Sequence, residues 1–141
     1  MIGIVVIAHG GLAAELLAAT EHVVGPLSAV RAIAVQPQDD PLALAAEVDA
    51  AVAETDRGQG VALVTDMLGG SPANLALGAL GETGREVIYG ANLPLLVKLA
   101  KARHLPLAEA AEAAVEAGRK YVDSAGRILA ARRLRASPAS A

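Results

Sequence analysis

Short runs of consecutive apolar residues alternate along this chain with segments in which apolar residues recur every three or four positions. Continuous apolar runs are typical of strands buried on both faces of a parallel sheet, and the longer spacing is typical of amphipathic helices. The runs predict strands at residues 2–8, 30–35, 61–65 and 86–90. Because strands that alternate with helices form βαβ units, the pattern predicts an α/β fold with a mainly parallel, doubly wound sheet.

The expected helices begin at recognisable signals. Asp40 followed by Pro41 is typical of an N-cap with proline at the first helical position. Ser71-Pro72 repeats this signature, so we expect Ser71 to cap a short helix. Helices are predicted at residues 12–24, 41–56, 71–80, 92–102 and 105–121.

Four strands joined by right-handed crossovers allow the strand order 2-1-3-4. In that order the chain leaves the first strand toward one edge of the sheet and the third strand toward the other. A crevice then opens between the carboxyl ends of these two strands, which is where open α/β sheets bind ligands. His9 follows the first strand and Asp66 follows the third, so both face the predicted crevice.

Composition narrows the function classes. The 141 residues include no cysteine, which excludes disulfides, a thiolate nucleophile and a zinc–cysteine site. This length fits one domain, which we place at residues 1–135, with a flexible tail at 136–141. With no Trp or Phe and only two Tyr, the chain lacks platforms for stacking nucleic-acid bases. No apolar stretch suits a membrane span or a signal peptide, so we expect a cytoplasmic protein without direct membrane insertion.

The net charge of −3 hides an uneven distribution. Residues 1–97 contain three basic and eleven acidic residues, whereas residues 98–141 contain nine basic and four acidic ones. An acidic surface near the predicted crevice favours a basic partner protein. The basic C-terminal part has three possible interpretations: contact with an acidic surface, contact with a membrane surface, or basic side chains that are simply solvated.

The residues at the crevice suit phosphoryl chemistry. An imidazole is a nucleophile through its unprotonated nitrogen, and a carboxylate that accepts the proton of the other nitrogen fixes the tautomer. His9 and Asp66 are the candidates for these two roles. Glycine-rich turns and helix amino ends supply hydrogen-bond donors for an anion. The expected donors are at Gly10, Gly11, Gly69, Gly70 and Ser71.

Each of these residues also has a structural interpretation. A histidine at a strand end often hydrogen-bonds to backbone, an aspartate there often forms a turn, and Ser71 could serve only as a helix cap. The convergence of His9, Asp66 and Ser71 on one crevice favours the chemical interpretation. His22 and His104 are interpreted as solvent-exposed side chains.

Three segments carry a resemblance to a known family. They are Ile-Val-Val-Ile-Ala-His-Gly at 4–10, Val-Thr-Asp-Met-Leu-Gly-Gly-Ser-Pro-Ala-Asn at 64–74 and Gly-Ala-Asn-Leu-Pro-Leu-Leu at 90–96. In their order and spacing, over about residues 1–120, they resemble the IIA component of the mannose family of the bacterial sugar phosphotransferase system. The resemblance implies a flavodoxin-like fold and a phosphoryl carrier. We expect no cofactor and no metal.

The resemblance also assigns roles to individual residues. It implies that Nε2 of His9 takes a phosphoryl group from phospho-HPr and passes it to a histidine of a IIB component, while Asp66 orients the ring. Ser71 belongs to the phosphate cradle by this analogy, and Asn92 lies near it. Family members form homodimers, often with an additional antiparallel C-terminal strand exchanged between subunits, and residues 122–130 are the only room for such a strand.

Several alternatives stay open at this point. Many family members continue into a IIB domain, so this chain is expected to use a separate IIB partner or to act as a phosphorylation-state sensor. A phosphotransferase subunit of a dihydroxyacetone kinase also carries an early histidine on a similar fold, although Gly69-Gly70-Ser71-Pro72 favours the mannose-type IIA. A histidine phosphatase is disfavoured because Ala8 stands where an arginine is expected. A ligand-binding domain with an inert His9 is the remaining alternative.

Overall fold

The sheet has four parallel strands in the order β2-β1-β3-β4, in a computed structural model that describes residues 1–67, 69–81 and 83–136. This confirms the predicted α/β class and the order 2-1-3-4. The two central strands are the most apolar ones, as expected for strands covered on both faces. The strands are β1 (Gly3–His9), β2 (Val30–Val35), β3 (Val61–Thr65) and β4 (Arg85–Tyr89).

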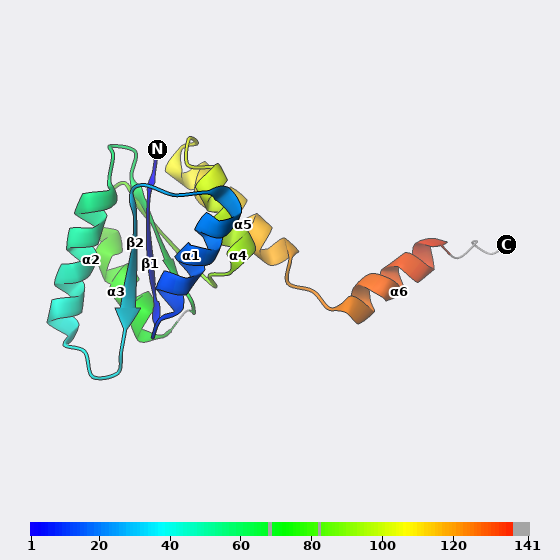
Figure 1. The fold of residues 1–141 in the computed structure, drawn as a ribbon, viewed down its shortest axis with the longest axis horizontal. Coiled ribbons are helices and arrows are strands. Elements are labelled where there is room, and N and C mark those ends of the chain that lie inside the picture. Colours follow the sequence, from blue (N-terminus) through cyan, green and yellow to red (C-terminus); the bar gives the residue numbers. More distant parts are fainter. Residues whose placement is uncertain (68, 82, 137–141) are drawn as a thin grey trace.

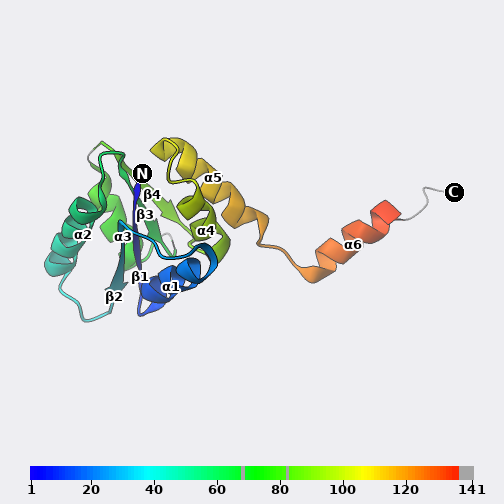
Figure 2. The same cartoon turned by 45° about the horizontal axis from the view of Figure 1, so that its top comes forward.

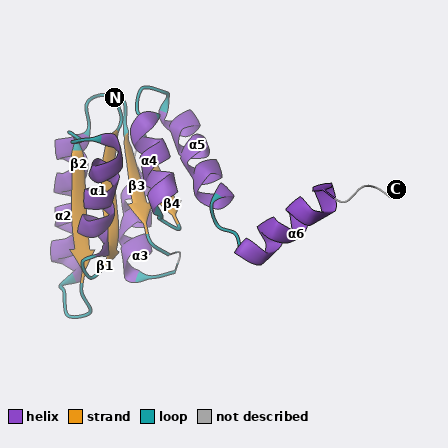
Figure 3. Cartoon of the chain, turned by 45° about the vertical axis from the view of Figure 1, so that its right-hand side comes forward, coloured by secondary structure: helices purple, strands orange, loops and turns teal. Residues whose placement is uncertain are grey.

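Helices cover both faces of this sheet (Figures 1 and 3). One face packs against α1, α4 and α5, and the other against α2 and α3. Alternate residues of β1 supply both apolar layers, since Ile4 and Val6 face the first set of helices while Val5 and Ile7 face the second. The helices are α1 (Leu12–Val24), α2 (Pro41–Thr55), α3 (Ser71–Gly78), α4 (Leu93–Lys101), α5 (Leu107–Lys120) and α6 (Ala125–Ala136), with a short 3-10 helix, η1 (Ala79–Gly81), after α3.

The amino edge of the sheet is closed by close packing. An added Cβ at Gly3 would lie 2.5 Å from the carbonyl oxygen of Thr55, so only glycine lets β1 pass the end of α2. Arg103 is 6% exposed and donates hydrogen bonds to the carbonyl oxygens of Ile2, at 2.8 Å, and Ala29, at 3.0 Å. Burial, with a smaller contribution from the charge of Arg57, lowers the pKa of Arg103. This side chain ties the start of β1 to the loop before β2.

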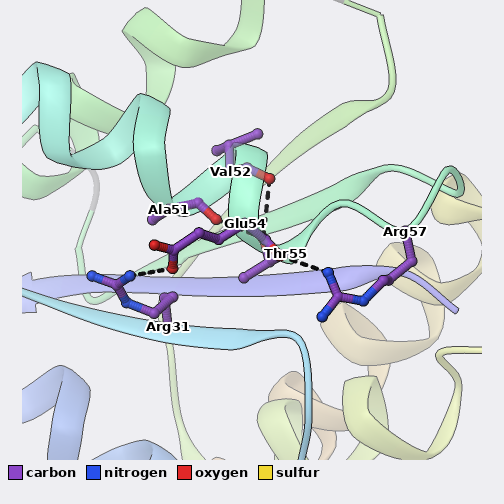
Figure 4. A network of polar contacts seen from close by, with 6 residues as sticks. All are labelled: Arg31, Ala51, Val52, Glu54, Thr55 and Arg57. Carbon is purple, nitrogen blue, oxygen red and sulfur yellow. Dashed lines mark hydrogen bonds and ion pairs between the residues drawn. The ribbon is translucent and has the colours of Figure 1, made fainter.

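Polar contacts also join α2 to the neighbouring strand (Figure 4). Arg31 of β2 forms an ion pair with Glu54 of α2. In the same turn of α2 the buried Thr55 hydroxyl donates to the carbonyl oxygen of Ala51 at 2.9 Å. The Arg57 guanidinium closes the end of the helix by donating to the Glu54 carbonyl oxygen at 2.7 Å.

The C-terminal segment is helical where the family resemblance left room for a strand. Residues 122–130 do not form an antiparallel strand, because α6 begins at Ala125 and extends away from the sheet (Figures 1 and 2). Alanine, leucine and arginine make up most of α6, and they favour helix over strand. No residue of α6 is buried. Of the tail expected at 136–141, Ala136 ends α6 and residues 137–141 lie outside the described part of the chain.

No helix within the described residues is both long enough and apolar enough to cross a membrane.

Candidate functional site

His9 and Asp66 meet at the carboxyl edge of the sheet. The ring atom Nδ1 of His9 lies 2.7 Å from Oδ2 of Asp66, and the backbone N–H of His9 donates to the same oxygen at 3.1 Å. Since β1 and β3 are hydrogen-bonded neighbours, residues 57 positions apart in sequence reach each other here. One carboxylate oxygen therefore holds both the backbone and the ring of the histidine.

The Asp66 carboxylate is held in its charged form. Its partial burial raises the pKa, but the hydrogen bonds from the ring and backbone of His9, the charge interaction with His9 and a backbone hydrogen bond outweigh this, so the pKa lies below its ordinary value. The second oxygen accepts the backbone N–H of Met67 at 3.0 Å. A charged carboxylate accepts a proton-bearing Nδ1, which leaves the lone pair of the neutral imidazole on Nε2.

The turn after β3 lies directly against the free edge of the imidazole. An added Cβ at Gly70 would be 2.9 Å from Cε1 of His9 and 3.4 Å from Nε2. Gly69, just before it, has a φ of +88°, a conformation that glycine adopts without strain. The His9 side chain is 49% exposed, whereas that of Asp66 is 13% exposed. The site thus presents a half-exposed imidazole beside main chain that carries no side-chain bulk.

The four helices that begin at this edge of the sheet differ in their amino ends. The outer two are capped, α2 by the Asp40 side chain and α4 by the Asn92 side chain. The two that begin beside His9 have glycine caps and no side-chain cap hydrogen bond: Gly11 precedes α1 and Gly70 precedes α3. The first N–H groups of a helix have no acceptor inside it, so α1 and α3 offer donors and a positive dipole end to an anion.

Ser71 does not have the local role that the sequence suggested, and Asn92 has a structural role that the sequence did not reveal. Ser71 is the first residue of α3 and not its cap, since Gly70 holds the cap position. Its side chain is exposed next to the turn that contacts His9. The Asn92 side chain accepts from the backbone N–H of Leu95 at 2.9 Å and donates to the carbonyl oxygen of Gly118 at 3.1 Å. Asn92 therefore starts α4 and ties it to α5, and these two hydrogen bonds engage both of its polar atoms.

Two residues at the site escaped sequence reasoning. Met67 is 57% exposed and lies beside Gly70, at the rim of the site. Thr65 is fully buried immediately before Asp66, and its hydroxyl has no hydrogen-bond partner among the described residues. For Met67, the available signal was a methionine directly after the aspartate that follows β3, outside any periodic apolar pattern. A threonine ending an otherwise apolar strand was the signal for the second.

The other two histidines lie on the surface. His22, in the last turn of α1, and His104, after α4, are both exposed. Among the described residues no group of three or more His, Cys, Asp or Glu side chains is placed to hold a metal ion. His9 is thus the histidine that combines a carboxylate partner with adjoining uncapped helix ends.

Comparison with known proteins gives a consistent result. The sequence profile of the family described as PTS system fructose IIA component, EIIA-man, matches residues 3–117. The PTS system mannose-specific EIIAB component of Escherichia coli strain K12 is 35% identical to the chain over 124 residues, which is 86% of this chain. The chain spans 38% of the length of that relative.

Solved structures of IIA proteins share the fold. The mannose/sorbose specific IIA subunit from Enterococcus faecalis superposes with a TM-score of 0.79 at 25% identity, covering 87% of this chain and 93% of the other. The PTS IIA protein associated with the fucose utilization operon of Streptococcus pneumoniae gives a TM-score of 0.75 at 28% identity, with 90% and 95% covered. These comparisons do not favour the dihydroxyacetone kinase alternative.

Proposed function

Because the chain belongs to the PTS system fructose IIA component family, we propose that it is a phosphoryl carrier of the sugar phosphotransferase system. In this function Nε2 of His9 accepts a phosphoryl group from phospho-HPr and passes it to a IIB component. The hydrogen bond between Nδ1 of His9 and Asp66 is the observation that carries the proposal. It leaves the lone pair on Nε2, the ring nitrogen that Asp66 does not engage.

The transfer step conserves atoms and charge without an added reagent. The Nε2 lone pair attacks the phosphorus of the donor phosphohistidine, a new N–P bond forms, and the old N–P bond breaks with its electron pair returning to the donor imidazole. The His9 ring gains positive character as it attacks. Asp66 stabilises that charge through the Nδ1 hydrogen bond while holding the ring in place.

We place the phosphoryl oxygens against the uncapped ends of α1 and α3. Backbone N–H groups at Gly10, Gly11, Gly69 and Gly70, together with the Ser71 hydroxyl, form the proposed cradle. Support comes from the Gly70 backbone beside Nε2 and from the absence of side-chain caps on these two helices. Asn92 supports the cradle by fixing the start of α4, a role that agrees with its two hydrogen bonds.

A phosphorylation assay tests the function and the site together. The full chain is incubated with enzyme I, HPr and phosphoenolpyruvate, and acid-labile phosphate on the protein is measured. We expect labelling of the wild type and of His22→Ala, but none of His9→Ala. His22 is a matched control because it is also an exposed histidine. Labelling that persists in His9→Ala, with circular dichroism showing an intact fold, would contradict the assignment.

The downstream acceptor is a separate part of the proposal. Adding a IIB component of the mannose family to the phosphorylated protein should discharge His9 at a rate far above spontaneous hydrolysis. A stable phosphoprotein that no IIB discharges would favour the alternative role of a phosphorylation-state sensor. The cytoplasmic location expected from the sequence stays a prediction.

We also propose that the protein is a homodimer. The segment from the end of α5 through α6 exposes large apolar side chains, although no residue of α6 is buried. These are Tyr121, Val122, Ile128, Leu129 and Leu134. A groove between β4 and α5 is lined by Glu86, Glu112 and Glu116 as well as by Arg119 and Lys120. In the proposed dimer the four arginines of α6 pair with these glutamates of the other copy.

Sedimentation analysis tests this assembly. The full chain should sediment as a dimer, and a chain ending at residue 122 should sediment as a monomer that still accepts phosphate. A full chain that is monomeric at high concentration would contradict the dimer. A truncated chain that is still dimeric would assign the contact to another surface.

A further inference from the structure

Thr65 carries a buried hydroxyl that the described residues leave without a partner. Its side chain is fully buried, and Oγ1 neither donates nor accepts a hydrogen bond within the described part of the chain. The other two buried threonines behave differently: Thr20 donates to the Leu16 carbonyl oxygen at 2.7 Å, and Thr55 donates within α2 (Figure 4). A buried polar group without a partner is unusual enough to require a physical reason.

The position of Thr65 links it to the phosphorylation site. Thr65 is the last residue of β3 and pairs with Ile7 of β1, whose side chain faces α2 and α3. Two residues beyond Ile7, His9 pairs with Val35, which faces the same layer. Because side chains two positions apart point to the same face of a sheet, Thr65 and His9 lie on one face as diagonal neighbours.

The element that covers this face is α3. It packs against β1 and β3, and its first turn begins at Gly70, the residue whose backbone lies against the His9 ring. Thr65 also precedes Asp66 directly in sequence. Thr65 therefore adjoins the carboxylate that holds the ring in sequence, and it lies on the sheet face that α3 covers.

A valine would serve the resting structure better than this threonine. It has nearly the same shape, suits a strand, and brings no hydroxyl that must lose its water on burial. Since the described residues offer the hydroxyl no partner, the threonine has a use if its hydroxyl finds one in another state of the protein. Phosphorylation creates such a state, because a dianionic group beside Gly70 draws the N–H groups at the start of α3 and so changes the hydrogen bonding of that turn.

Building on the proposed function, we infer that Thr65 is a positioning residue for the phosphorylated state. When His9 carries a phosphoryl group, the Thr65 hydroxyl forms a hydrogen bond with the main chain at the start of α3, residues 70–73. This bond holds the turn in the arrangement that binds the phosphoryl oxygens. The hydroxyl contacts neither the phosphorus nor its oxygens, and it acts through the backbone that does.

The test compares Thr65→Val with Thr65→Ser, which keeps the hydroxyl, and with Thr55→Val, which removes a satisfied hydroxyl far from the site. Three quantities are measured on the full chain. They are the urea midpoint of the unphosphorylated protein, the rate of phosphorylation by phospho-HPr, and the shift in melting temperature that phosphorylation causes.

We expect Thr65→Val to keep or raise the urea midpoint and to be phosphorylated about tenfold more slowly, because one hydrogen bond is missing in the phosphorylated state. Its melting temperature should respond less to phosphorylation than that of the wild type. Thr65→Ser should restore the rate. Thr55→Val should show the opposite pattern, with a lower midpoint and an unchanged rate. If Thr65 had a purely structural role, Thr65→Val would lower the urea midpoint, as Thr55→Val does, and would not slow phosphorylation selectively.

Two results would overturn the inference while leaving the phosphocarrier function intact. One is a Thr65→Val protein that is phosphorylated at the wild-type rate. The other is a Thr65→Val protein whose urea midpoint falls as far as that of Thr55→Val, which would mean that the hydroxyl already has a partner at rest. A wild type that takes no label at all would instead overturn the phosphocarrier function, and this inference with it.

Discussion

The two edges of the sheet are built in opposite ways. At the amino edge Gly3 lets β1 pass against the Thr55 carbonyl, and the buried Arg103 ties two chain segments together. At the carboxyl edge Gly70 leaves room beside an exposed imidazole, and the two helices nearest to His9 lack side-chain caps. Glycine thus allows close packing of main chain at one edge, and at the other it leaves the main chain beside His9 uncovered by a side chain.

This contrast separates stability from chemistry within one small sheet. The contacts at the amino edge are made in the folded protein and lost on unfolding, so they contribute to the free energy of unfolding. The groups at the carboxyl edge leave donors unused, which costs stability at rest and makes them available to an anion. Substitutions at the two edges should therefore change different measured quantities.

The largest expected effect is on phosphoryl transfer. Asp66→Asn should slow phosphorylation of His9 by about 10²-fold to 10⁴-fold, because an amide can present a donor where Nδ1–H needs an acceptor. The rate of labelling by phospho-HPr measures this. Asp56→Asn is the control from the amino edge, where the Asp56 carboxylate also accepts a backbone N–H, from Gly58 at 2.8 Å. An unchanged rate in Asp66→Asn would reduce Asp66 to a turn residue.

At the opposite edge, Arg103→Met should lower the free energy of unfolding by about 2–3 kcal/mol, because two carbonyl oxygens lose a buried donor. Urea denaturation measures the loss. Arg57→Met is the control, since Arg57 is exposed and should change stability by less than about 1 kcal/mol. The folded Arg103→Met protein should accept phosphate at the wild-type rate, and a loss of transfer without a loss of stability would break the separation between the edges.

A pair of identical substitutions sharpens the comparison further. Gly3→Ala should cost about 1–3 kcal/mol of stability through overpacking against Thr55 and leave transfer by the folded protein intact. Gly70→Ala should cost less stability, because the His9 ring is partly exposed and can move, but it should slow transfer by displacing that ring. The urea midpoints and labelling rates of both variants show whether Gly3→Ala acts mainly on stability and Gly70→Ala mainly on transfer. Equal effects on both quantities in the two variants would refute the contrast.

The smallest expected effect is the acid dependence of stability. Asp66 has a folded-state pKa below its ordinary value of 3.8, so its contribution is fully present above that pH and is lost as pH falls through the folded-state pKa. The stability difference between wild type and Asp66→Asn should accordingly shrink as urea titrations are repeated at decreasing pH. A difference that does not depend on pH would show that Asp66 stabilises the fold by another route.

Much of the fold could be predicted because local signals and burial agreed. The strands at 30–35 and 61–65 match β2 and β3, and the cap at Asp40 forms as expected. The strand order followed from connection rules that depend on few residues. His9 and Asp66 could be singled out because each is a polar residue at the carboxyl end of a strand at the crevice.

The remaining features depend on contacts that sequence patterns do not encode. Arg103 precedes His104, whose side chain was predicted to be solvent-exposed, and only the return of the chain to the start of β1 makes Arg103 buried. Serine is a residue type typical of helix N-caps, but Gly70 holds the N-cap position of α3 and Ser71 is the first helical residue. The Gly70 main chain lies against the His9 ring, a contact that the sequence pattern does not reveal. The C-terminal strand was suggested by resemblance to a family, and local helix propensity prevailed at α6 instead.

The separation of His9 and Asp66 along the chain has a consequence for biosynthesis. His9 is among the first residues to be made, yet its carboxylate partner follows 57 residues later. At about 5–20 residues per second, a nascent chain carries an unoriented imidazole for several seconds before β3 can pair with β1. A growing polypeptide is thus incompetent for phosphorylation until its central strand pair has closed, and acquisition of label during translation would report the moment at which that pair forms.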